Sequence, residues 1–311
     1  MGLGTWAWGD KSTWGMNDYD RSYGFETIRD AYRASVAGGV TFLDTAEGYG
    51  NGESERIIGR LLAEDAEHRF RIVIATKFFP APYKVLVESA LMTSLRASLE
   101  RLKLPWVHLY QIHGPISLRS HRAMAAALAA AHRAGLVKAV GVSNYSEKEM
   151  RNIHAALAEH GIALATNQVE FSLLRTMPES AGLLAACKEL GVVVLAYSPL
   201  GMGRLTGKYS AANPPPGKRN FSAFPMEEID PIVAALRRMG ERHGGKSPSQ
   251  VALNWIICKG AVPIPGAKNQ QQAEQNAGAL GWRLSADEVR ELDALSKPGQ
   301  RRLIHRLWQH G

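Results

Sequence analysis

Cysteine is scarce in this sequence: its 311 residues contain only two, Cys187 and Cys258. Two thiols cannot build a disulfide framework or a cysteine zinc cluster. Both lie in apolar stretches with helical periodicity, which favours inert, buried thiols.

Long apolar runs are also missing. The longest weakly polar stretches, 123–131 and 192–203, fall short of the roughly 18 to 20 apolar residues that a membrane helix needs. The first residues show neither the basic and apolar segments of a secretory signal nor the composition of a transit peptide. We therefore expect no membrane span and a cytoplasmic location, with the plastid stroma as the alternative if a transit peptide has been removed.

Acidic side chains are fewer than basic ones, 29 against 37, which gives a net charge of +8. Such a surplus attracts nucleic acid when it gathers on one face. Part of it, however, follows the last acidic residue as Lys297, Arg301, Arg302 and Arg306, which we interpret as a solvated tail. No module that reads RNA or DNA is visible, so we expect no nucleic-acid partner. A modest positive field also suits a phosphorylated cofactor.

What the sequence does contain is an alternation of short β-type runs with longer helical segments. Strands that alternate with helices indicate a parallel sheet, and eight repeats favour a closed (β/α)8 TIM barrel over an open doubly wound sheet. We predict an α/β fold with one barrel domain spanning residues 1–311. The eight predicted strands are Gly2–Trp8, Val40–Asp44, Ile72–Lys77, Val107–His113, Ala139–Ser143, Ala165–Glu170, Val192–Tyr197 and Ala261–Pro265.

Apolar spacing and capping residues predict several of the helices between these strands. Apolar spacing predicts helices over Glu53–Ala63 and Val85–Leu102, and a third that begins at Ser146 or Glu147. A capping pattern, Ser285 with Glu288, begins a helix that extends to Leu295.

A long segment at about residues 200–230 departs from this rhythm, with several glycines and a run of three prolines. Loops of this length are usually functional lids or disordered insertions, and barrels commonly bind phosphate after the seventh strand. We therefore expect a functional lid or a disordered insertion here, with a flexible loop as the plainer interpretation.

Residues 240–247 formally match the phosphate-binding pattern G-x-x-x-x-G-K-S. A true P-loop follows a buried strand, whereas the residues before Gly240 have helical spacing. Pro248 suits the first turn of a new helix capped by Ser247. We therefore predict a helix, a glycine turn and a second helix rather than a nucleotide site.

Polar residues follow the predicted strands at their C-terminal ends, which converge on one mouth of a barrel. Four of them suit proton donation to a carbonyl oxygen. An ammonium, Lys77, beside a phenol, Tyr49, is expected to lower the phenol pKa from about 10. Asp44 would keep Lys77 charged. His113 would orient the carbonyl oxygen, or share in supplying its proton, while Tyr49 acts as the general acid. Taken singly, each has a plainer interpretation: a buried ion pair, a packing aromatic or a core histidine.

These residues lie within a set of ordered motifs that resembles the aldo-keto reductase superfamily over nearly the whole chain. The opening Gly-Thr-Trp-Ala-Trp-Gly-Asp is most similar to the plant and cyanobacterial branch. The motifs are Gly2-Leu-Gly-Thr-Trp6, Phe42-Leu-Asp-Thr-Ala-Glu-Gly-Tyr49, Ala75-Thr-Lys77, Tyr110-Gln-Ile-His113, Val140-Gly-Val-Ser-Asn-Tyr145, Asn167-Gln-Val-Glu170, Ala196-Tyr-Ser-Pro-Leu-Gly201 and Pro263-Ile-Pro-Gly266.

The resemblance implies reduction of an aldehyde or ketone by NADPH, with Tyr49 as proton donor and with Lys77, Asp44 and His113 completing the catalytic set. It also implies that Tyr197 stacks on the nicotinamide ring, which fixes the face that delivers hydride. The carboxamide is expected to bind Ser143, Asn144 and Gln168. The remaining cofactor-binding residues that it implies are Ser198, Leu200, Gly201, Lys208, Gly266, Lys268, Gln272 and Asn276.

The sequence departs from the family pattern at two places. Lys268 is the only cation of its motif, because Gln272 stands where relatives have a second basic residue. NADPH stays favoured over NADH, since Lys268 lies near a helix N-terminus that attracts anions; the alternative is an ordinary exposed lysine. Gly114 replaces a bulky aromatic, which predicts a roomier pocket there, with Trp6 and Glu47 as further pocket walls.

Two other functions stay open. The chain could be a nicotinamide-nucleotide-binding redox sensor or regulatory subunit with little turnover, although the intact four-residue set argues for an enzyme. A metal-dependent hydrolase would need several His and carboxylate ligands at strand ends, and only His113, Asp44 and Glu170 are available there. We therefore predict no metal, a small-molecule carbonyl substrate, and a monomer or weak oligomer.

Overall fold

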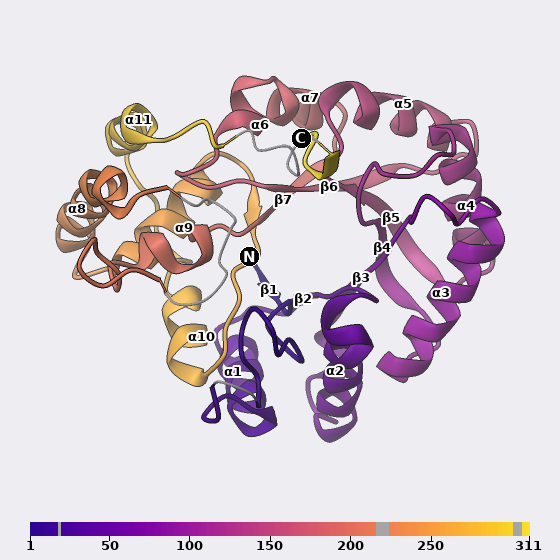
Figure 1. Ribbon diagram of the computed structural model, residues 1–311, viewed down its shortest axis with the longest axis horizontal. Helices are drawn as coiled ribbons and strands as arrows, with labels where there is room; N and C mark the ends of the chain where they lie inside the picture. Colours follow the sequence, from indigo (N-terminus) through magenta and orange to yellow (C-terminus); the bar gives the residue numbers. More distant parts are fainter. Residues whose placement is uncertain (18–19, 216–223, 301–306) are drawn as a thin grey trace.

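The computed structural model describes residues 1–17, 20–215, 224–300 and 307–311. Its eight strands are parallel, and each pairs with the next along the chain (Figure 1). The Gly4 amide donates to the Pro265 carbonyl at 2.9 Å, and Gly4 bridges Gly266, so the two ends of the sheet meet. The predicted barrel is confirmed. The strands are β1 Gly2–Gly4, β2 Phe42–Asp44, β3 Val73–Phe78, β4 Val107–Ile112, β5 Val137–Ser143, β6 Leu164–Glu170, β7 Val193–Tyr197 and β8 Val262–Pro263.

Helices surround this barrel, as Figure 1 shows. The α-helices are α1 Phe25–Ala37, α2 Glu53–Glu64, α3 Val87–Leu102, α4 His121–Arg133, α5 Glu147–Ala158, α6 Met177–Ser180, α7 Leu183–Glu189, α8 Met226–Arg242, α9 Pro248–Cys258, α10 Gln270–Ala277 and α11 Ala286–Leu295. The described residues also form the short 3-10 turns η1 Tyr49–Gly52, η2 Arg69–Arg71 and η3 Gly201–Thr206.

Side-chain caps explain where several helices begin. The Ser285 hydroxyl accepts from the Glu288 amide, and the Glu288 carboxylate accepts from the Ser285 amide, so the predicted capping box at α11 is confirmed. Ser247 caps α9 in the same way with Gln250. The segment that imitates a P-loop is therefore the predicted turn between two helices, α8 and α9.

The predicted long loop at about 200–230 contains ordered elements at both ends. It begins with the 3-10 turn η3, and α8 already starts at Met226. Residues 216–223 lie outside the described part of the chain.

Alternate residues of a strand share one face, so every second residue points into the barrel. Along the strands, these inward-facing residues change from apolar to polar. Ala75, Leu109 and Leu195 form a small apolar cluster. Two residues further along β3 and β4 are Lys77 and Gln111, and both are buried. The polar layer thus lies toward the C-terminal ends of the strands.

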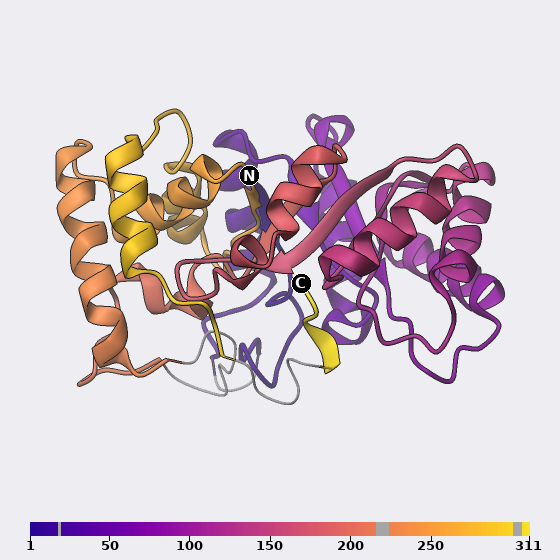
Figure 2. The same ribbon diagram turned by 90° about the horizontal axis from the view of Figure 1, so that it is seen from above.

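Loops gather at that same end. In Figure 2 the segment after β1, the segment after β7 and residues 307–311 all lie on one side of the barrel. The expected solvated tail is wrong for the described residues: Lys297 pairs with Glu228 at 3.6 Å, and Gln309 and Gly311 are buried. Arg301, Arg302 and Arg306 lie outside the described residues.

The two cysteines lie in helices, as predicted. Cys187 is buried in α7, and burial raises the pKa of its thiol to about 12. Cys258 is half-buried at the end of α9. Among the described helices, none is long and apolar enough to cross a membrane.

Candidate active site

Asp44 and Lys77 form a buried ion pair at the ends of β2 and β3. Lys77 Nζ lies 2.6 Å from Asp44 Oδ2 and 2.8 Å from the Thr45 carbonyl oxygen. Asp44 Oδ1 accepts a second hydrogen bond, from Gln168 Nε2 at 2.8 Å. Burial lowers the pKa of Lys77, and the Asp44 carboxylate opposes that shift.

Tyr49 begins the turn η1, five residues after the end of β2 at Asp44, and its hydroxyl lies 3.4 Å from Lys77 Nζ. Burial, and then the Asp44 carboxylate, raise the pKa of Tyr49 well above its usual value. The expectation that Lys77 lowers this pKa is therefore wrong in its net direction, because burial and the Asp44 charge both raise it. Tyr49 stays protonated across the working pH range, so its hydroxyl is available as a proton donor.

His113 follows β4 and faces Tyr49, with ring centroids 5.7 Å apart in an edge-to-face arrangement. Burial, and then the charge of Lys77, hold the pKa of the His113 imidazole well below its usual value. Within the described residues, its buried Nδ1 atom has no hydrogen-bond partner. A neutral ring with unused hydrogen-bonding capacity beside a protonated phenol suits a carbonyl oxygen as ligand.

Four predicted cofactor residues gather on the ends of β5, β6 and β7. Tyr197 donates to Asn144 Oδ1 at 2.9 Å, and Ser143 donates to the Gln168 carbonyl at 2.8 Å. Asn144 Nδ2 makes long contacts of 3.3 Å to the Ser143 hydroxyl and to the His113 carbonyl oxygen. This amide can therefore exchange its partners for those of a ligand carboxamide.

Two predicted cofactor residues that follow β5 and β7 are held in the left-handed backbone region, Asn144 with φ of 63° and Ser198 with φ of 48°. Non-glycine residues adopt this conformation at an energetic cost, and it is concentrated at functional sites. The turn at Ser198 continues through Leu200 and Gly201 into the segment that ends with exposed Lys208.

The other predicted cofactor residues lie around β8 and α10. Lys268 is half-buried and donates to the Trp14 carbonyl at 2.6 Å, so it is not an ordinary exposed lysine. Its backbone amide donates to Gln272 Oε1 at the start of α10, as expected for a lysine beside a helix N-terminus. Asn276 Nδ2 donates to the Gly266 carbonyl at 3.2 Å.

The sequence model of the Aldo/keto reductase family matches residues 1–297 of this chain. The chain belongs to this family. It is 37% identical to the chloroplastic pyridoxal reductase of Arabidopsis thaliana, over 99% of this chain and 86% of that protein. It is 30% identical to L-glyceraldehyde 3-phosphate reductase of Escherichia coli K12, over 91% and 86% of the two chains.

Solved structures agree with this membership of the aldo/keto reductase family. The NADPH complex of an aldo-keto reductase from Klebsiella pneumoniae has a TM-score of 0.74 at 27% identity, covering 97% of this chain and 92% of that one. The glycerol dehydrogenase of Gluconobacter oxydans has a TM-score of 0.80 at 26% identity, covering 97% and 93%. The protein is thus an oxidoreductase by family, as its sequence predicted.

The two predicted pocket-wall residues, Trp6 and Glu47, make different contacts in this aldo/keto reductase. Trp6 packs edge-to-face on Trp14, with centroids 5.7 Å apart. Glu47 accepts from the Phe79 amide at 2.6 Å and lies 3.4 Å from Lys84 Nζ, so it fixes the loop after β3.

The expected extra room at Gly114 is absent, because the Trp308 ring occupies it. A Cβ atom added to Gly114 would lie 2.9 Å from that ring. Sequence reasoning missed this contact, and with it Gln309 and Arg175, since those residues lie outside every strand-end motif. The one available signal was an aromatic residue, Trp308, inside a segment otherwise interpreted as a solvated tail.

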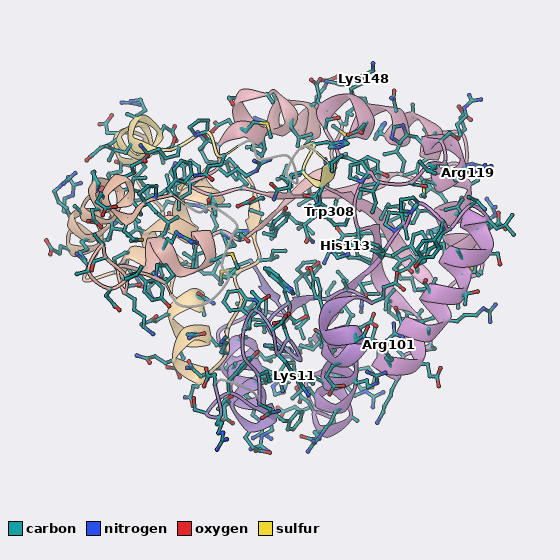
Figure 3. The ribbon with its side chains drawn as sticks, viewed as in Figure 1. Lys11, Arg101, His113, Arg119, Lys148 and Trp308 are labelled. Carbon is teal, nitrogen blue, oxygen red and sulfur yellow. The ribbon has the colours of Figure 1, made fainter. Side chains whose placement is uncertain are left out.

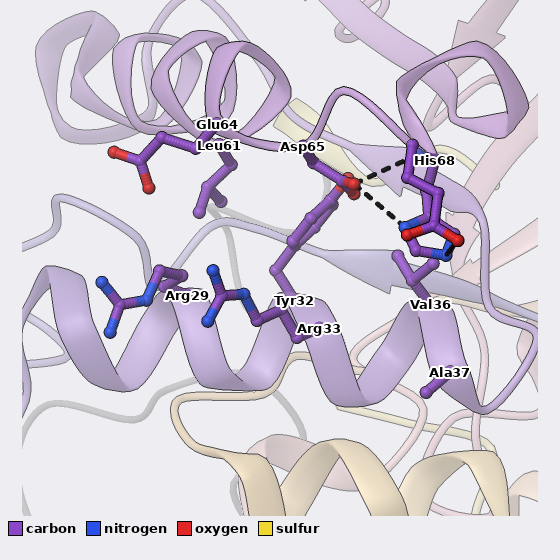
Figure 4. A pocket seen from close by; sticks show the side chains of 10 residues that line it. Arg29, Tyr32, Arg33, Val36, Ala37, Leu61, Glu64, Asp65 and His68 are labelled. Carbon is purple, nitrogen blue, oxygen red and sulfur yellow. Dashed lines mark hydrogen bonds and ion pairs between the residues drawn. The ribbon is translucent and has the colours of Figure 1, made fainter.

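A pocket of about 300 Å³ opens elsewhere, between α1 and α2 (Figure 4). In it Tyr32 donates to Asp65 at 2.7 Å, and His68 Nδ1 lies 2.9 Å from the same carboxylate. Its lining includes none of the predicted site residues, so we place the active site at the strand ends. Within the described ranges, no group of three His, Cys, Asp or Glu residues could hold a metal ion.

Proposed function

We propose that this protein reduces an aldehyde or ketone to an alcohol with NADPH, and that Tyr49 donates the proton. The observation that carries the proposal is the grouping of Tyr49, Lys77 and His113 at one barrel end. The residues fit the cofactor, because hydroxyl and amide groups lie beside the half-buried Tyr197 ring and Lys268 stands near a helix N-terminus. The NADPH complex of the Klebsiella relative supports the same choice.

NADPH, when bound, supplies the hydride. Ser143, Asn144 and Gln168 would hold its carboxamide, and the Tyr197 ring would stack on the nicotinamide. Lys268 stands beside the N-terminus of α10, where the 2′-phosphate would lie. The proposal also assigns Ser198, Leu200, Gly201, Lys208, Gly266, Gln272 and Asn276 to cofactor binding.

The chain's own residues then transfer one proton to the carbonyl oxygen of the substrate. Neutral His113 donates a hydrogen bond to the carbonyl oxygen and orients it toward Tyr49. The Tyr49 hydroxyl gives its proton to that oxygen as negative charge develops on it. Lys77, 3.4 Å away and held by Asp44, stabilises the phenolate that remains.

Replacing Tyr49 by Phe tests the proposal. We expect NADPH oxidation with a test aldehyde to fall by at least about a hundredfold, the usual range for a lost general acid, while the NADPH dissociation constant stays within about twofold. Tyr83→Phe is the matched control, because Tyr83 is 80% exposed. Unchanged turnover in Tyr49→Phe would remove Tyr49 as the acid. A wild-type protein that binds NADPH without reducing any carbonyl of a broad panel would instead favour the sensor.

A further inference from the structure

Glu55, in the first turn of α2, is a fully buried carboxylate with 0% of its surface exposed. Its Oε1 atom accepts from the Thr76 hydroxyl at 2.6 Å, and its Oε2 atom accepts from Arg101 Nε at 2.6 Å. Thr76 belongs to β3 and Arg101 to the last turn of α3, so one side chain joins three elements. A buried carboxylate is tolerated when its charge is paired and its oxygens are hydrogen-bonded, as they are here.

This network lies behind the barrel wall rather than in the barrel mouth. Thr76 and Lys77 are consecutive in β3, so their side chains lie on opposite faces of the strand. Lys77 points into the barrel, whereas Thr76 points outward to Glu55 on α2. Figure 3 shows Arg101 in the outer layer, between α2 and α3 and away from His113. Glu55 therefore reaches the candidate active site through Thr76 and the backbone of β3.

Arg101 also packs against the turn that carries Tyr49. The turn η1 begins at Tyr49 and ends at Gly52, whose φ of 84° lies in the left-handed region that favours glycine. A Cβ atom on Gly52 would lie 2.7 Å from Arg101 Cδ and 2.8 Å from Arg101 Nε, so the arginine is in close contact with the backbone of this turn. Arg101 Nη2 donates to the Ser98 hydroxyl at 3.1 Å, which holds the side chain in that position.

The charge of Glu55 also acts on Lys77. Burial lowers the pKa of Lys77, and the Asp44 carboxylate and, to a smaller extent, the Glu55 carboxylate oppose that shift. The other titratable groups that face the ammonium are the Tyr49 hydroxyl, at 3.4 Å, and the His113 imidazole. Glu55 thus contributes to the electrostatic balance of the site without lying in it.

We propose that Glu55 and Arg101 are positioning residues for proton transfer, because their ion pair connects the turn that carries Tyr49 with the strand that carries Lys77. This rests on the proposed reductase function. The Tyr49 hydroxyl and Lys77 Nζ lie 3.4 Å apart, a distance that a small movement of η1 or β3 would change. Displacement of a reacting group by about 1 Å can cost about a hundredfold in rate, even when the change is made far from the reacting atoms. The pair acts on kcat through this distance, from its position behind the barrel wall.

Glu55→Gln tests the proposal, because it removes the charge with little change in shape. With NADPH and a test aldehyde, we expect kcat to fall at least about tenfold, while the KM for the aldehyde and the NADPH dissociation constant stay within about twofold. The alkaline limb of the kcat profile should move to lower pH, since Lys77 loses a negative neighbour. Glu64→Gln is the matched control, because Glu64 ends the same helix and its ion pair with Arg60 is exposed.

Three further variants separate positioning from general stability. Arg101→Lys keeps the charge but loses the planar group beside Gly52, and Thr76→Val removes the hydroxyl donor, so both should lower kcat as Glu55→Gln does. Thr76→Ser keeps the hydroxyl and should retain most of the wild-type kcat. Urea denaturation gives the folded fraction of each variant, and kcat is expressed per folded molecule.

A purely structural network would lower the urea midpoint and leave kcat per folded molecule and the alkaline limb unchanged. That result in Glu55→Gln, Arg101→Lys or Thr76→Val would overturn the assignment, and so would a loss that appears in KM rather than in kcat. Absence of NADPH-dependent reduction in the wild-type protein would instead contradict the proposed function, so the two failures are distinguishable.

Discussion

Lys77 Nζ lies 2.6 Å from Asp44 Oδ2, and the two side chains are only 0% and 3% exposed. Removing two charges from water costs several kcal/mol for each ion, which their attraction and added hydrogen bonds must offset. The stability of the fold therefore depends on the same two residues that serve the proposed proton transfer.

Breaking this pair should destabilise the fold. We expect Lys77→Met to lower the free energy of unfolding by about 3–5 kcal/mol, because the Asp44 carboxylate is left buried without its cation. Adding Asp44→Asn should restore part of that stability without restoring activity. Urea denaturation and NADPH turnover measure the two effects separately. Equal instability of the single and double variants would show that the Asp44 charge is not the cause.

The pH dependence of reduction should follow Lys77 rather than His113. Burial lowers the pKa of Lys77 below its usual value of 10.5, so the stabilising charge is lost as pH rises through that lowered pKa. The pKa of His113 is held well below 6.5, so the imidazole stays neutral and gives no inflection near that pH. We expect kcat/KM to be flat through pH 6–7 and to fall on the alkaline side. A rise or fall centred near pH 6.5 would contradict the neutral His113.

Lys268 should contribute to the choice between cofactors. Its ammonium donates to the Trp14 carbonyl near the start of α10, where an anionic phosphate is favoured. In Lys268→Ala we expect the NADPH dissociation constant to rise about tenfold, the size of one charge-assisted hydrogen bond, with little change for NADH. Lys148→Ala is the control, since Lys148 lies on α5 at the outer surface (Figure 3). An equal loss for both cofactors would remove the phosphate assignment.

The helix cap at Ser285 offers a test that does not involve the site. Its hydroxyl accepts from the Glu288 amide at 3.2 Å and closes the first turn of α11. Ser285→Ala should lower the free energy of unfolding by about 1 kcal/mol and leave turnover unchanged. Thermal or urea unfolding measures the first effect, and a changed kcat would contradict the separation of α11 from the active site.

Much of the fold could be predicted because its signals are local. The alternation of β-type runs with helical periodicity marked all eight strands, although β1 ends at Gly4 rather than at Trp8. Caps such as Ser247 and Ser285 bond to amides three residues away, so they are visible in a short stretch of sequence. The convergence of Asp44, Lys77 and His113 followed from one rule, that parallel strands of a barrel end on one rim.

The sequence by itself determined the barrel, its order of elements and the residue types at its mouth, because backbone periodicity and capping act over a few residues. Only the tertiary structure decided how Trp308 comes to cover Gly114 and in which direction burial shifts the pKa of Tyr49. Both depend on which distant groups exclude water from one place. Packing and desolvation are sums over neighbours in space, and no short stretch of sequence records them.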